Sequence, residues 1–139
     1  MRPAFTLVEM ALVLTLVAIV AGITVPAVAR QLDRMAVASA TAELAGAFQA
    51  ARDQAIATGR PMAVRLDETS PAVTVEHGAD TLVHRDLAAA HGVSLTATRD
   101  SMTYLPNALA AGAANLSVTV TRGAATRTLT VSRLGRVRW

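Results

Sequence analysis

The longest run of apolar positions lies near the N-terminus, at residues 10–29 (MALVLTLVAIVAGITVPAVA), and it contains no charged side chain. As an α-helix these 20 residues rise about 30 Å, the thickness of the hydrocarbon core of a bilayer. The alternative is a secretory signal peptide cut at residues 21–22 or 27–29, but such signals have a shorter apolar core. Because the helical pattern also continues beyond residue 29, we expect a membrane-spanning helix.

Residues 28–58 continue as a helix whose apolar positions gather on one face. At intervals of seven, four, three and four residues this face carries Val37, Leu44, Phe48, Ala51 and Ala55. The polar side chains of the segment fall largely elsewhere, at Glu43, Gln49, Arg52 and Asp53. Gly59 is a suitable C-terminal cap and Pro61 prevents the helix from continuing. This half of the helix is therefore predicted to pack on a core.

Beyond Pro61 the pattern changes to alternation of apolar and polar residues, the period of β-strands. The predicted strands are Met62–Asp67, Ala72–His77 and residues 82–87, 93–99, 117–122 and 126–131. The last two form a hairpin across residues 123–125, in which one apolar face is shared by Val118, Val120, Leu129 and Val131. The small-residue segment 108–114 is predicted to be a loop. We expect an α+β fold in which the long N-terminal helix packs on an antiparallel β-sheet.

Composition and charge reduce the range of possible functions. The chain has no cysteine, which excludes disulfides and thiolate metal sites. All 13 basic residues are arginine. Residues 1–100 hold eight arginines and all ten acids, a net charge of −2, whereas residues 101–139 hold five arginines and no acid. The C-terminal region is therefore a basic segment on a nearly neutral body.

The segment FTLVEM, residues 5–10, follows a short basic leader and precedes the apolar run. It resembles the class III signal of type IV pilins and pseudopilins. The resemblance implies that a prepilin peptidase cuts between Ala4 and Phe5 and methylates the new amine of Phe5. It also implies that Glu9 pairs with that amine on a neighbouring subunit during assembly, although a first-turn acid also stabilises a helix N-terminus by itself. Pro26 occupies the place of a helix-softening proline. Ala4 departs from the family pattern, which usually has glycine.

Two further segments resemble the GspH/FimT group of minor pseudopilins and minor pilins. They are ARDQAI with Gly59-Arg60-Pro61 at the helix exit, and SRLGRVR at residues 132–138. The resemblance implies a leader at residues 1–4, a transmembrane and filament-core helix at 5–28 and a globular pilin-like domain at 29–139. It also implies a single-pass protein of the bacterial inner membrane, whose C-terminal domain lies in the periplasm or at a filament tip.

Catalytic and metal-binding chemistry find little support in the sequence. His77, His84 and His91 recur every seven residues, but this odd spacing alternates faces along a strand and no carboxylate cluster has ligand spacing. Nucleophile-elbow and phosphate-loop patterns are also missing. We predict no catalytic residue, no metal and no cofactor.

The C-terminal arginines are the main candidates for a binding function. In an extended segment 133–139, Arg136 and Arg138 share one face and Val137 faces the other way. Gly135, Arg136 and Arg138 match a Gly-Arg-any-Arg motif that is associated with DNA binding in the FimT branch. Further candidate contacts are Arg122, Arg127, Arg133 and Trp139, the last by stacking on a base. The alternative is structural, because terminal arginines also pair with acids or protect a sheet edge.

Three hypotheses follow. The first is a non-catalytic minor pseudopilin of a type II secretion pseudopilus, whose partners are other pseudopilins and secreted cargo. The second is a minor type IV pilin that captures DNA for uptake through the arginine motif. The third is a membrane-tethered domain that never assembles.

Overall fold

The computed structural model describes residues 6–111 and 115–139. The predicted cleavage site between Ala4 and Phe5 lies outside the described residues. The chain divides into two compact units, the first ending at Leu32 and the second comprising Asp33–Trp139.

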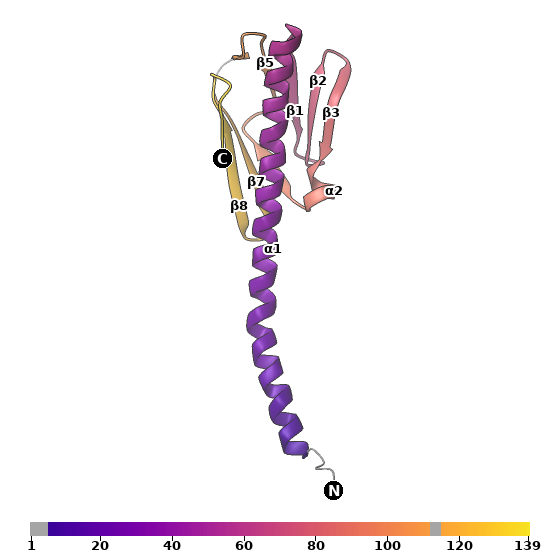
Figure 1. Ribbon diagram of the computed structural model, residues 1–139, viewed down its shortest axis with the longest axis vertical. Helices are drawn as coiled ribbons and strands as arrows, with labels where there is room; N and C mark the ends of the chain where they lie inside the picture. The colour runs from indigo at the N-terminus through magenta and orange to yellow at the C-terminus, as the bar shows by residue number, and fades with distance from the viewer. Residues whose placement is uncertain (1–5, 112–114) are drawn as a thin grey trace. The chain divides into compact units, whose positions relative to one another are not determined.

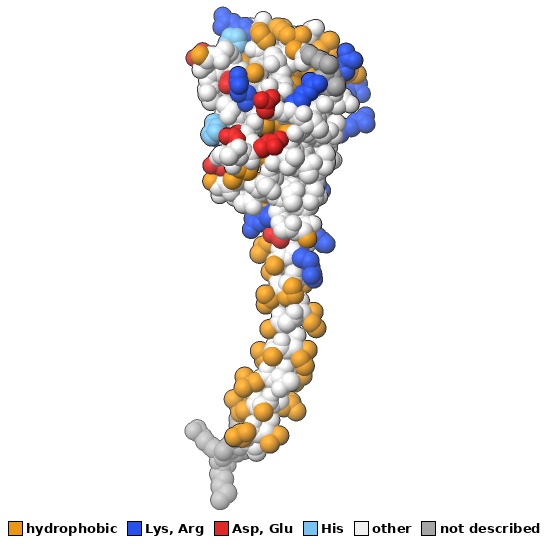
Figure 2. Space-filling model, turned by 180° about the vertical axis from the view of Figure 1, so that it is seen from behind, with side chains coloured by type: hydrophobic (Ala, Val, Ile, Leu, Met, Phe, Trp, Pro, Cys, Tyr) orange, Lys and Arg blue, Asp and Glu red, His pale blue; other side chains and the backbone are white. Residues whose placement is uncertain are grey.

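Helix α1 (Leu7–Thr58) begins in the first unit with a side-chain cap. The backbone N–H of Glu9 donates to Oγ1 of Thr6 at 3.2 Å, so Thr6 and Glu9 hold the positions of a Thr-x-x-Glu capping box. Pro26 lies inside the helix without ending it. This part of α1 is long and apolar enough to cross a membrane, and its most apolar window has no buried residue. Apolar side chains cover much of its visible surface in Figure 2.

In the second unit, α1 packs one face against β-sheets. The five apolar positions predicted to face a core are all buried, namely Val37, Leu44, Phe48, Ala51 and Ala55, which confirms the predicted face. The helix ends at Thr58, and Gly59 follows with φ +66°, a left-handed conformation that favours glycine.

The strands form two antiparallel sheets (Figure 1), which refines the single sheet predicted. In the described residues, the first has the order β3 (Asp80–Asp86), β2 (Ala72–His77), β1 (Met62–Asp67), β5 (Ser101–Tyr104), β6 (Ala110–Ala111). The second has the order β4 (Ser94–Ala97), β7 (Leu116–Arg122), β8 (Ala125–Val131), β9 (Val137–Arg138). One hydrophobic cluster joins both sheets to α1.

The β7–β8 hairpin confirms the predicted buried face of Val118, Val120, Leu129 and Val131, although Val120 lies opposite Arg127 rather than an apolar residue. Val118 lies opposite Leu129 and Leu116 opposite Val131, and the four side chains are buried. Each such burial stabilises the fold by about 1.5–3 kcal/mol. The turn is tighter than predicted, because Arg122 pairs with Ala125 and leaves a two-residue loop.

The predicted strand at residues 82–87 is displaced in the structure. The strand is Asp80–Asp86, and Leu87 starts the short helix α2 (Leu87–His91). The reason is local, because the Asp86 carboxylate accepts the N–H of Ala89 at 2.8 Å and caps the helix. The predicted strand at 93–99 is likewise shorter, at Ser94–Ala97.

Two further strands were not predicted from the sequence. β5 pairs with β1 through four residues of each strand. β6 lies within the segment 108–114 that was predicted to be a loop, so that prediction is wrong at Ala110–Ala111. Residues 112–114 of the segment lie outside the described part.

Candidate functional site

The basic C-terminal segment forms a tight turn rather than one extended strand. The N–H of Gly135 donates to the Ser132 carbonyl at 2.9 Å, and the N–H of Ser132 donates to the Arg136 carbonyl at 2.9 Å. The predicted extended conformation of residues 133–139 is therefore wrong at 133–135. The following Val137–Arg138 form β9, which pairs with β8.

Gly135 is required at this turn by both backbone conformation and space. It is buried, with φ +72°. A Cβ atom there would lie 2.6 Å from the carbonyl oxygen of Ala108 and 3.1 Å from Cε1 of Tyr104. The glycine of the Gly-Arg-any-Arg motif therefore has a structural reason, because its backbone passes directly over the β5–β6 loop.

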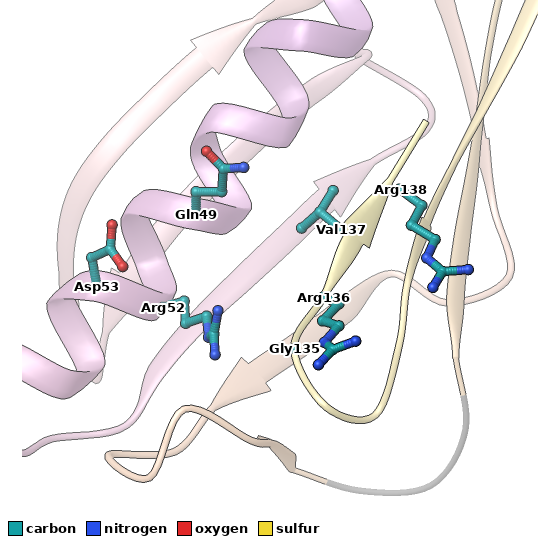
Figure 3. Close-up of a pocket in the computed structure, with 7 residues that line it drawn as sticks. All are labelled: Gln49, Arg52, Asp53, Gly135, Arg136, Val137 and Arg138. Carbon is teal, nitrogen blue, oxygen red and sulfur yellow. The ribbon is translucent and has the colours of Figure 1, made fainter.

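The two motif arginines lie as predicted relative to the residue between them. Arg136 and Arg138 are exposed, while Val137 is half-buried and packs against the core. In Figure 3 Val137 extends to one side of β9 and the two arginines to the other. Within residues 6–111 and 115–139, neither arginine forms an ion pair. Both guanidinium groups are therefore available to a ligand.

A pocket of about 540 Å³ separates the C-terminal turn from α1. It is lined by Gln49, Arg52, Asp53, Gly135, Arg136, Val137 and Arg138. Figure 3 shows Arg52 reaching from α1 toward the turn. Three arginines and one aspartate give the lining a net charge of +2, which suits an anionic group such as a phosphate or carboxylate. The sequence analysis did not assign Arg52 to this site, although positions 49, 52 and 53 share a helix face.

Two buried polar atoms of residues that lie close to Gly135 have no hydrogen-bond partner in the described part of the chain. They are the Tyr104 hydroxyl and Nε of Arg52. Burial raises the pKa of Tyr104 to about 12, while the positive charge of Arg52 acts in the opposite direction. The desolvated phenol is therefore held in its neutral form.

Comparison with known protein families identifies the family to which this chain belongs. Residues 40–135 match the family described as Type II transport protein GspH. The chain belongs to the GspH family. A comparison with curated protein sequences finds no match.

Solved structures share the pilin-like fold of this GspH-family chain. The type IV minor pilin FimU of Pseudomonas aeruginosa has a TM-score of 0.63 at 18% identity, over 73% of this chain and 86% of FimU. The minor pseudopilin EpsH from the Type 2 Secretion System of Vibrio cholerae has a TM-score of 0.55 at 14% identity, over 72% of this chain and 91% of EpsH. At these identities the likeness establishes the fold.

Two of the predicted contact residues of this GspH-family chain lie away from the C-terminal turn. Nε of Arg122 pairs with Asp33 on α1 at 3.1 Å, and its guanidinium also donates to the His91 carbonyl. Arg122 therefore links β7 to α1 through an ion pair and to α2 through a hydrogen bond. Arg127 lies beside Arg34 at a separate pocket. The structure thus does not bring these two arginines together with Arg136.

The three regularly spaced histidines have separate partners. Nδ1 of His77 donates to the Pro61 carbonyl at 2.9 Å, and His84 hydrogen-bonds Thr74. Nε2 of His91 lies 2.9 Å from Glu43. Among the described residues, no three His, Cys, Asp or Glu side chains gather as a metal site.

The pKa of Tyr104 gives a pH prediction. Below pH 10 the phenol is neutral in both the folded and unfolded states. The contribution of the neutral phenol to the free energy of unfolding is therefore fully present. As pH rises to about 12 the unfolded state ionises first, and about 2–3 kcal/mol of stability is lost. Tyr104 is the single tyrosine, so phenolate absorbance during an alkaline titration reports it alone. We expect a midpoint near 12; a midpoint near 10 would show that the ring is solvated. Tyr104→Phe removes the signal and serves as the control.

Proposed function

We propose that this protein is a non-catalytic minor pseudopilin of a type II secretion pseudopilus. The observation that carries the proposal is the match of residues 40–135 to the GspH family. The apolar first part of α1 supports it, because a filament subunit of this kind needs a segment that is stable in the membrane before assembly.

In this proposal the N-terminal segment supplies processing and assembly. A prepilin peptidase cuts between Ala4 and Phe5 at the inner membrane. The carboxylate of Glu9 then pairs with the new amine of Phe5 on a neighbouring subunit, and Pro26 allows local bending of the packed helix. The domain from residue 29 onward, in the periplasm or at a filament tip, contacts other subunits or secreted cargo.

Replacing Glu9 tests assembly. Glu9→Gln keeps the size of the side chain but leaves the partner amine without a counter-charge in an apolar setting. Loss of one member of a buried pair costs about 3 kcal/mol, so co-purification with the other pseudopilins is expected to fall on the order of 100-fold. Secretion into the medium should fall with it. Cross-linking followed by affinity purification of the full chain measures the first effect.

Asp80→Asn, the same carboxylate-to-amide change at an exposed site on β3, is the control and should leave both readouts unchanged. If Glu9→Gln also leaves them unchanged, the chain acts as a membrane-tethered domain outside any filament.

A second candidate function is DNA capture by a minor type IV pilin. It is supported by the exposed Arg136 and Arg138 beside the pocket that Arg52 enters. Arg133 and Trp139 are also exposed near the turn and would extend the contact. DNA uptake measured in the same cells as secretion distinguishes the two functions, because Glu9→Gln should abolish only the process that the filament serves.

A further inference from the structure

A second basic pocket lies at the other end of the β7–β8 hairpin. It has a volume of about 350 Å³ and is lined by Arg34, Val37, Ala124, Ala125, Thr126 and Arg127. Arg34 and Arg127 are exposed, whereas Val37 is buried and belongs to the core. Two arginines that are distant in the sequence therefore border one small pocket, whose base includes a residue of the hydrophobic core.

The charge of this pocket is not cancelled by its acidic neighbour. Asp33 adjoins Arg34 in the sequence, but its carboxylate is engaged by Arg122 at 3.1 Å. Across residues 6–111 and 115–139, neither Arg34 nor Arg127 forms an ion pair. The pocket therefore retains two positive charges, which is the setting for an anionic oxygen ligand.

The place of Arg34 in the chain points to the source of that ligand. Arg34 follows Ala29, the last residue of the uncharged run, by five positions on the same helix. Five helical residues rise about 7.5 Å, and the headgroup region on each side of a bilayer is about 5–8 Å deep. If residues 10–29 span the hydrocarbon core, Arg34 is a juxtamembrane residue, only five positions along the chain from the end of the span.

We propose that the pocket of Arg34 and Arg127 binds the phosphate of an anionic phospholipid headgroup. The guanidinium forks match phosphate oxygens, and the β7–β8 turn closes the site from the side opposite α1. Bound lipid would hold the domain against the membrane surface before the subunit is extracted into a filament. The site is independent of the C-terminal turn and of its ligand.

The test uses the full chain in a neutral detergent, titrated with short-chain phosphatidylglycerol and followed by native mass spectrometry. Each juxtamembrane arginine is expected to contribute about fivefold in affinity, so the double variant Arg34→Gln, Arg127→Gln should bind about 25-fold more weakly. The control is Arg60→Gln, Arg99→Gln, which removes the same charge at exposed sites away from the pocket and should bind normally. Thermal unfolding of each variant verifies that the domain is folded.

Two further ligands test whether the pocket recognises an anionic lipid rather than any lipid or any phosphate. Phosphatidylcholine of the same chain length should bind more weakly than phosphatidylglycerol, because its headgroup has no net charge. Inorganic phosphate should compete poorly; competition at the concentration of the lipid would make this a free-phosphate site and overturn the lipid assignment. Equal losses in the pocket and control variants, or no preference for phosphatidylglycerol, would also overturn the proposal. None of these results bears on filament assembly or DNA capture.

Discussion

Replacing Gly135 with alanine is expected to destabilise the domain by about 2–5 kcal/mol. The residue has φ +72°, and a non-glycine residue in this conformation costs about 1–2 kcal/mol. The added methyl would also lie 2.6 Å from the Ala108 carbonyl oxygen and 3.1 Å from the Tyr104 ring, and relieving such overpacking costs about a further 1–3 kcal/mol. Denaturant unfolding of the full chain in detergent measures the change in the free energy of unfolding.

Gly78→Ala separates the two contributions. Gly78 has a similar φ of +61°, but a Cβ atom there meets nothing within 4 Å. This variant should therefore lose only the conformational part, about 1–2 kcal/mol. If Gly135→Ala is no worse than Gly78→Ala, the contact between the C-terminal turn and the β5–β6 loop does not constrain position 135.

Removing Arg136 and Arg138 together is expected to weaken DNA binding by a salt-dependent factor. If each arginine neutralises one phosphate, the slope of log affinity against log salt becomes less steep by about 1.8. Extrapolated from 1 M salt, this corresponds to a loss on the order of 200-fold at 50 mM and about 20-fold at 200 mM. Fluorescence anisotropy of labelled duplex DNA with the full chain, carried out across this salt range, measures both quantities for Arg136→Gln, Arg138→Gln.

The matched control is again Arg60→Gln, Arg99→Gln, which lowers the net charge equally. A specific site predicts a much smaller loss in the control. Similar losses in both variants would mean that DNA responds only to overall charge. If the wild type fails to bind at 50 mM salt, DNA capture is excluded under these conditions. The arginines would then serve contacts between subunits, as in a secretion pseudopilus.

Arg52 adds a further contrast in the same assay. It lines the pocket beside the motif, and its Nε is buried without a partner in the described residues. Arg52→Gln should weaken DNA binding if the pocket holds a phosphate. It should leave binding unchanged if contact is confined to the outer face of β9.

Local physical chemistry by itself determined much of this protein. An uncharged run of 20 residues predicts an apolar helix, and the structure has a helix there that is long enough to cross a membrane. The helical spacing of Val37, Leu44 and Phe48 specifies the buried face, and Gly59 with Pro61 specifies the helix end. The FTLVEM and SRLGRVR segments indicated the family because they are contiguous motifs. The signals for α2, a capping Asp86 and a terminal Gly92, were also local, although alternation extended the predicted strand across them.

Only the tertiary structure decided how distant segments meet. Strand order depends on burying apolar faces jointly, so the pairing of β5 with β1 and the division into two sheets do not follow from the pattern of any one strand. The same holds for the sites. Arg52 lines one pocket with the C-terminal turn, and Arg34 lines another with Arg127, because the shared core brings α1 against the second sheet. A sequence pattern records which residues face inward, whereas the neighbours of an exposed arginine are fixed by the packing of the whole domain.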